Sequence, residues 1–177
     1  MGPFHGPGDE PKELVKRSIG ADGMMRPLAI LWQRLVNSRG ETCDRCGLTF
    51  AALQRALTKL NDVLGPLDIE PSLETIAMQE PSFRADPSGS NQIWIAGKPL
   101  EEWLGGRAGS SRCCSVCGDA ECRTLEAGGT VFEAIPEHLI LKAALIAAAQ
   151  MLEPTGEAPS PDGVVCSCGT ACCAEAH

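Results

Sequence analysis

The chain has 177 residues, of which 44% are hydrophobic, and its 15 basic and 23 acidic residues give a net charge of −8. This length suits one domain with a hydrophobic core, and the acidic balance argues against nucleic-acid binding, which requires a basic face. No apolar segment reaches the roughly 18 residues that a membrane span requires, and the N-terminus has no apolar leader segment. We therefore expect a cytoplasmic protein with no membrane or nucleic-acid partner.

The first predicted elements are a strand and a helix, after a loosely ordered arm over residues 1–24. Residues 28–36 form an apolar run, which is typical of a strand in the middle of a sheet. A helix is predicted to begin at the CxxC motif that follows and to end at Gly65 and Pro66, which are helix-stopping residues. Its apolar stripe recurs at helical spacing through Leu53, Leu57, Leu60 and Leu64.

Three further strands and a last helix are predicted downstream. Residues 67–74 alternate between apolar and polar side chains, and Pro71 places this strand at a sheet edge because proline has no N–H to donate. Residues 93–95 and 130–135 predict the remaining strands, and residues 137–152 predict an apolar helix. The elements over residues 25–152 therefore predict an α/β domain with a central four-stranded mixed sheet flanked by helices.

The ten cysteines of the chain fall into three groups, and in a reducing compartment such clusters indicate metal binding or redox chemistry. The first group is Cys43 and Cys46, at the start of the predicted helix, where backbone N–H groups favour a thiolate. We expect Cys43 to be the reactive thiolate, with a lowered pKa, and Cys46 to resolve a mixed disulfide or to share a metal ion. The alternative is that the pair forms half of a structural zinc site.

The second group lies in a glycine-rich insertion over residues 105–129. Three close thiols suit a three-coordinate metalloid such as arsenite, or mercury, whereas four suit tetrahedral zinc. A disulfide that pins the insertion is the alternative. The candidate metal ligands of this group are Cys113, Cys114, Cys117 and Cys122.

The third group ends the chain, in a linker and Cys-rich tail over residues 153–177. The linker is rich in proline and glycine, so we expect the tail to be flexible. Such a tail is suited to capturing soft ions and passing them to the folded thiols by ligand exchange. Its candidate ligands are Cys166, Cys168, Cys172 and Cys173.

Five segments of the chain resemble a small prokaryotic thioredoxin-like family known as a domain of unknown function. These segments are ILWQRLV, ETCDRCG, SNQIWIAGKPLEEWL, CCSVCGDAECRT and VFEAIPEHLILKAALIAA. The resemblance covers residues 25–152 and implies a thioredoxin-like fold, in which Cys43 and Cys46 match the thioredoxin CxxC, and a link to metal and metalloid handling. Thioredoxins have a cis-proline before the third core strand, whereas this chain has Ser90, Asn91 and Gln92 there.

These observations favour a cytosolic thioredoxin-like protein that binds soft metal or metalloid ions through thiolates, for detoxification or transfer. The candidate ions are arsenite, mercury, zinc and copper, and no organic cofactor is expected. One alternative is an enzyme, a thiol–disulfide oxidoreductase in which Cys43 and Cys46 are catalytic. Another is a structural interaction module held together by zinc. A redox or transport protein is the expected macromolecular partner.

Overall fold

The computed structural model describes residues 25–113 and 121–153. The predicted N-terminal arm, the tail cysteines, and Cys114 and Cys117 of the second group lie outside these residues. Within the two described ranges, no helix has both the length and the apolar character needed to cross a membrane.

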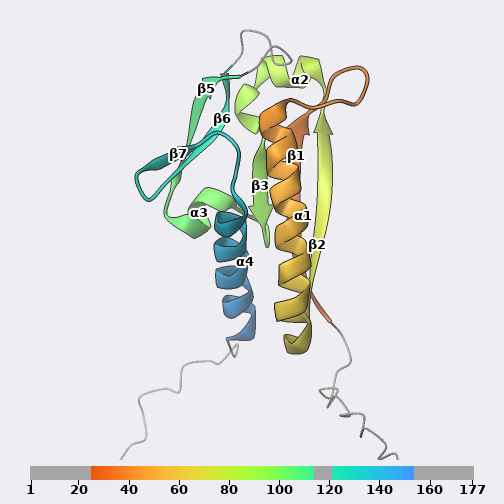
Figure 1. Ribbon diagram of the computed structural model, residues 1–177, viewed down its shortest axis with the longest axis vertical. Helices are drawn as coiled ribbons and strands as arrows, with labels where there is room; N and C mark the ends of the chain where they lie inside the picture. Colours follow the sequence, from red (N-terminus) through yellow and green to blue (C-terminus); the bar gives the residue numbers. More distant parts are fainter. Residues whose placement is uncertain (1–24, 114–120, 154–177) are drawn as a thin grey trace, which may run out of the picture.

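The central sheet is four-stranded and mixed, with the strand order β2-β1-β3-β4. Figure 1 shows β1 between β2 and β3. Strand β1 (Arg26–Leu35) pairs in parallel with β2 (Ile69–Met78) and antiparallel with β3 (Gln92–Ile95), which pairs antiparallel with β4 (Lys98–Pro99). The predicted four-stranded mixed sheet is therefore confirmed. Strand β2, which carries Pro71, lies at an edge of this sheet as predicted.

The predicted strand over residues 130–135 does not belong to the central sheet. It forms β7 (Thr130–Phe132) of a second, antiparallel sheet, in which β6 (Glu121–Ala127) lies between β7 and β5 (Arg107–Arg112). The fourth strand of the central sheet is β4 instead, which has two residues and is too short to produce a periodic pattern. The Cys-rich insertion is therefore built on a pair of antiparallel strands.

Two glycines bring the chain from helix α3 (Leu100–Leu104) into strand β5. Gly105 ends the helix with φ 61°, a left-handed conformation that glycine adopts without steric cost. A Cβ atom on Gly106 would lie 2.4 Å from the carbonyl oxygen of Glu126, so only glycine permits this approach of β5 to β6. The two glycines thus determine where the second sheet starts.

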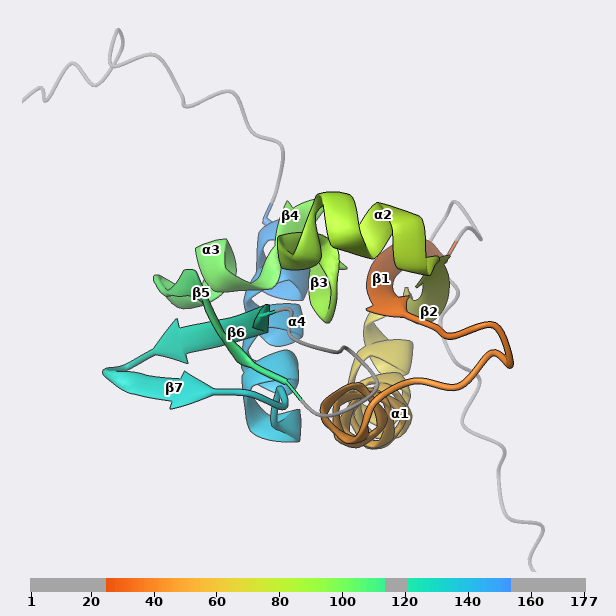
Figure 2. The ribbon, with the colours of Figure 1, turned by 90° about the horizontal axis from the view of Figure 1, so that it is seen from above.

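Two long helices cover one face of the central sheet, α1 (Asp44–Leu64) and α4 (Glu137–Leu152). Figure 2 shows them on the same side of the strands, with α2 (Glu80–Ala85) on the opposite side. Side chains of α1 tie the two helices together, because Arg55 and Lys59 both form ion pairs with Glu137. Two 3-10 turns complete the described elements, at Gly65–Leu67 and Pro87–Gly89.

The core lies between the central sheet and these two helices. Leu28, Ile30 and Trp32 of β1 are fully buried, whereas the alternate residue Ala29 is exposed. A strand buried on both faces was expected from the apolar run, but β1 fully buries one face, the side of α1 and α4, whereas the short α2 lies on the other side (Figure 2). Three leucines of the apolar stripe predicted for α1 are buried, Leu53, Leu60 and Leu64, and the fourth, Leu57, is partly buried.

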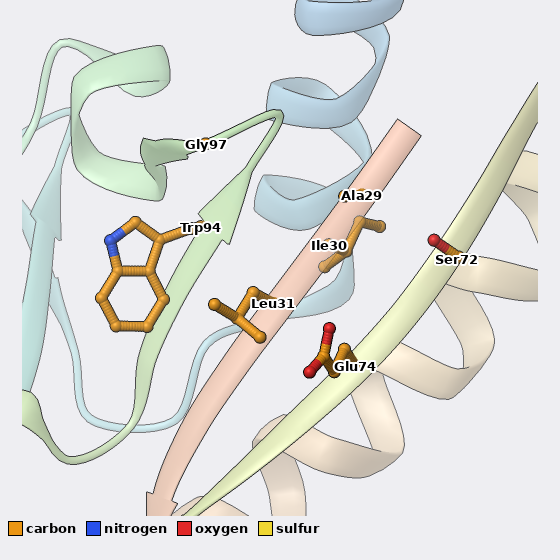
Figure 3. Close-up of a pocket in the computed structure, with 7 residues that line it drawn as sticks. All are labelled: Ala29, Ile30, Leu31, Ser72, Glu74, Trp94 and Gly97. Carbon is orange, nitrogen blue, oxygen red and sulfur yellow. The ribbon is translucent and has the colours of Figure 1, made fainter. Parts of the chain in front are cut away.

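The opposite face of the sheet has a hollow of about 290 Å³. Leu31, Glu74 and Trp94 line it from three neighbouring strands, and they point away from the helices (Figure 3). No cysteine among the described residues lines this hollow, so it is separate from the thiols.

A buried hydrogen bond joins α1 to the segment before α4, and it provides a test of the packing. The Thr49 hydroxyl, which is fully buried, accepts a bond of 3.0 Å from the Ile135 N–H. Thr49→Val should lower the free energy of unfolding by about 1–3 kcal/mol, because a buried N–H loses its acceptor. Urea unfolding under reducing conditions measures this change. Thr58→Val, an exposed position on the same helix, should change the stability by less than about 0.5 kcal/mol.

Candidate thiol site

Cys43 lies at the N-terminus of α1, where the sequence placed it. It is the N-cap residue, with φ −74° and ψ 164°, and its side chain makes no capping hydrogen bond. Its carbonyl accepts the N–H of Gly47 at 2.9 Å, which begins the helical hydrogen bonding. The side chain is only 3% exposed. The sulfur therefore combines the helix N-terminus, which favours an anion, with near-complete burial.

Cys46 lies one turn further along α1 and is 1% exposed. Its hydrogen bond with the Cys43 side chain is the main cause that raises the Cys46 pKa far above that of an ordinary thiol, followed by burial and the charge of Cys43. A hydrogen bond with Thr42 acts in the opposite direction. Cys46 therefore keeps its proton at neutral pH.

Cys113, which directly follows strand β5, lies beside Cys43. Its thiol lies 3.6 Å from the sulfur of Cys43 and donates a hydrogen bond to it, although the two residues are 70 positions apart in the chain. Cys113 is partly exposed, unlike Cys43 and Cys46. The first and second cysteine groups thus meet at one site.

Cys122 brings a fourth thiol near this site from strand β6. It pairs with Ser111 across the β5–β6 ladder, is 2% exposed, and contributes to the raised pKa of Cys46 through its charge. The structure therefore places two members of the second group beside the CxxC motif. The other two, Cys114 and Cys117, lie outside the described residues. Among residues 25–113 and 121–153, no three His, Cys, Asp or Glu side chains are already grouped to hold a metal ion.

Arg45, which lies between the two CxxC cysteines, connects α1 to strand β5 by hydrogen bonds. Its guanidinium donates to the Ser111 hydroxyl at 2.8 Å and to the carbonyl of Arg112, the residue before Cys113. It also forms an ion pair of 2.7 Å with Glu133, whose carboxylate accepts the Ser111 hydroxyl at 2.9 Å. We call these three side chains, Arg45, Ser111 and Glu133, the clamp. The clamp holds the chain beside Cys113 against the chain beside Cys43.

Asn91 supports the same region, and sequence reasoning did not assign it a role. It is 3% exposed and has φ 55°, a left-handed conformation that asparagine tolerates better than most residues. Its side chain accepts the Trp32 indole N–H at 3.2 Å and donates to the Glu133 carbonyl at 3.3 Å. The available signal was the segment Ser90, Asn91 and Gln92, which lacks the proline expected there. No cis peptide bond occurs in the described ranges.

Comparison with known proteins identifies the family. The sequence profile described as a domain of unknown function, DUF2703, matches residues 28–144, so the chain belongs to this family. A protein of Archaeoglobus fulgidus named "Uncharacterized protein" is 39% identical over 113 residues, which are 64% of this chain and 82% of that protein. No solved structure matches the chain significantly.

The raised pKa of Cys46 leads to a test. Cys43→Ala should lower the Cys46 pKa, because it removes both the hydrogen bond and the charge that raise it. A lower thiol pKa means more thiolate at a given pH, so the midpoint of Cys46 alkylation against pH should move down. Mass spectrometry of the tryptic peptide over residues 46–55, which contains no other cysteine, measures the alkylation.

The matched control is Cys122→Ala, which removes only the smallest of the causes that raise the Cys46 pKa. It should leave the midpoint almost unchanged, and circular dichroism should show that both variants are folded. An unmoved midpoint in Cys43→Ala would contradict the hydrogen bond between the two CxxC thiols.

Proposed function

We propose that this member of the family binds soft metal or metalloid ions through thiolates, for detoxification or transfer, with Cys43 and Cys113 as the first two ligands. The observation that carries the proposal is the 3.6 Å approach of the two sulfur atoms. Thiolates are the protein ligands that soft ions prefer. The helix N-terminus under Cys43 favours the anionic form that binds such ions.

The burial of the sulfurs supports a small ligand. Cys43 is 3% exposed, which leaves little room for a folded protein carrying a disulfide, whereas a single ion can approach through the partly exposed Cys113. Because the described residues contain no complete ligand set, we expect Cys43 and Cys113 to take the ion first. Cys46 then follows as a third ligand on losing its proton.

The ligand number distinguishes the candidate ions. Mercury needs two thiolates and arsenite needs three, whereas zinc needs a fourth, for which Cys122 is the available thiol. The tail cysteines remain candidates for first capture, and a redox or transport protein remains the candidate partner. A thioredoxin-like fold is part of the proposal, because the central β1, its parallel neighbour β2 and the CxxC at the start of α1 agree with it.

Titration of the reduced full-length protein with arsenite, mercury and zinc tests the proposal. For arsenite, Cys43→Ser and Cys113→Ser should each weaken binding at least about tenfold, because each removes a ligand. Cys122→Ser is the matched control, and it should weaken zinc binding but not arsenite binding. Binding that survives both ligand variants but is lost when the four tail cysteines are replaced would show that the tail, not this site, holds the ion.

A second candidate function is thiol–disulfide exchange at Cys43. The specific observation that favours it is the difference between the CxxC thiols, since Cys46 is a protonated, buried thiol and Cys43 caps the helix. This pattern suits a nucleophile with a neighbour that donates a hydrogen bond to it.

The second candidate predicts catalysis of disulfide reduction. The full-length protein should accelerate the reduction of a small disulfide such as glutathione disulfide by dithiothreitol, and Cys43→Ser should abolish the acceleration. Replacing the four tail cysteines with serine is the control, and this change should leave the rate intact. A wild-type protein that is no faster than free thiol would exclude this function and leave ion binding as it stands.

A further inference from the structure

The three thiols of the site form a series of decreasing exposure. Cys113 is partly exposed, Cys43 is 3% exposed and Cys46 is 1% exposed. The contacts follow the same order, because the Cys113 thiol donates to the Cys43 sulfur and Cys43 hydrogen-bonds to Cys46. Cys113 is therefore the most accessible of the three thiols to a reagent that arrives from solvent.

The separation of Cys43 and Cys113 is short enough for a bond between them. Their sulfurs are 3.6 Å apart, and a disulfide has a sulfur–sulfur distance of about 2.05 Å, so the two sulfurs need to approach by a further ~1.5 Å for a bond to form. The clamp keeps both segments in place on either side of this gap. Cys46 is 1% exposed, so a small disulfide has less access to it than to the partly exposed Cys113.

We propose that Cys113, not the CxxC motif, is the thiol that reacts first with small disulfides, and that Cys43 then resolves the product to form a Cys43–Cys113 disulfide. The inference rests on the second candidate function, thiol exchange, and it names the thiols that carry out the exchange. It differs from the expected order, in which Cys43 attacks first and Cys46 resolves.

The two steps balance as follows, with a small disulfide RSSR as the oxidant. The Cys113 thiol passes its proton to the Cys43 sulfur and attacks one sulfur of RSSR, so that a Cys113–SR bond forms, the S–S bond of RSSR breaks and one thiolate RS⁻ leaves. Cys43 then attacks the Cys113 sulfur, so that the Cys43–Cys113 bond forms, and the second RS group leaves with the proton from Cys43 as RSH. The two cysteines are oxidised to one disulfide, and RSSR is reduced to two thiols.

The positions of the arginines make the product easy to identify. Trypsin cleaves after Arg39, Arg45, Arg112 and Arg123, so Cys43 and Cys46 fall in different peptides. Residues 40–45 contain only Cys43, residues 46–55 contain only Cys46, and residues 113–123 contain the second cysteine group. The reduced full-length protein is treated with glutathione disulfide, quenched with an alkylating agent, digested without reductant and analysed by mass spectrometry.

The proposal predicts a linkage between peptides 40–45 and 113–123 in the wild type. Cys113→Ser should lose this linkage and leave Cys43 largely unmodified. Cys43→Ser should instead accumulate glutathione on Cys113, located by fragmentation of the peptide. Cys114→Ser, which alters the adjacent cysteine in the same peptide, is the matched control and should retain the linkage.

Three outcomes would overturn the proposal. One is a linkage between peptides 40–45 and 46–55 in the wild type, which is the conventional CxxC disulfide. Another is rapid addition of glutathione to Cys43 in Cys113→Ser, which would make Cys43 the first thiol while leaving thiol exchange intact. A wild type in which none of these peptides reacts would reject both the order and the exchange function.

The clamp provides an independent variant that leaves every cysteine in place. Glu133→Gln removes the charge that pairs with Arg45 but keeps the size of the side chain. It should reduce the yield of the Cys43–Cys113 linkage and increase glutathione retained on Cys113, because the second step depends on the position of β5. An unchanged ratio of linked to glutathione-bearing peptide would contradict the positioning role of Glu133.

Discussion

The contact between Arg45 and the end of strand β5 is the interaction on which the thiol site depends. An ion pair with a half-exposed carboxylate such as that of Glu133 contributes little to stability by itself. The arginine also binds the Ser111 hydroxyl and the Arg112 carbonyl, and its planar guanidinium fixes several directions at once. Its main effect is therefore positional, because it places Cys113 beside Cys43.

Placing Arg45 inside the CxxC motif couples two properties of the site. The same short segment provides the Cys43 thiol at the helix N-terminus and the side chain that positions the third sulfur, that of Cys113. A substitution of Arg45 would therefore change the position of Cys113 relative to Cys43, in addition to changing the local charge. In this protein Arg45, which lies between the CxxC cysteines, has a structural role in assembling the site.

The sequence was sufficient for those features that local pattern controls. The strand before the CxxC motif, the long helix after it and the edge position of the strand that contains Pro71 all follow from periodicity and from the chemistry of proline. Membership of the family known as a domain of unknown function is also confirmed. These features depend on neighbours within a few residues, which a single sequence contains.

The features that the sequence did not predict depend on contacts between residues that are far apart in the chain. Strand β5, RAGSSR, consists of small and charged residues that are mostly exposed, so no apolar alternation marks it as a strand. The assignment of residues 130–132 to the second sheet depends on pairing with β6, which the local pattern does not encode. The meeting of Cys43 and Cys113 requires hydrogen bonds across 66 and 67 positions, from Arg45 to Ser111 and Arg112, and spacing along the chain gives no sign of them.

Among the described residues, the two sheets share no backbone ladder, since β2-β1-β3-β4 and β5-β6-β7 are separate in hydrogen bonding. The Cys43–Cys113 contact is therefore a side-chain contact between the residue after β5 and the start of α1. Backbone bonds within either sheet can persist while side-chain contacts of this kind open, as in local unfolding. A disulfide or a shared ion between the two sulfurs would keep this contact closed, so the chemical state of Cys43 and Cys113 would control the local opening of the chain at this point.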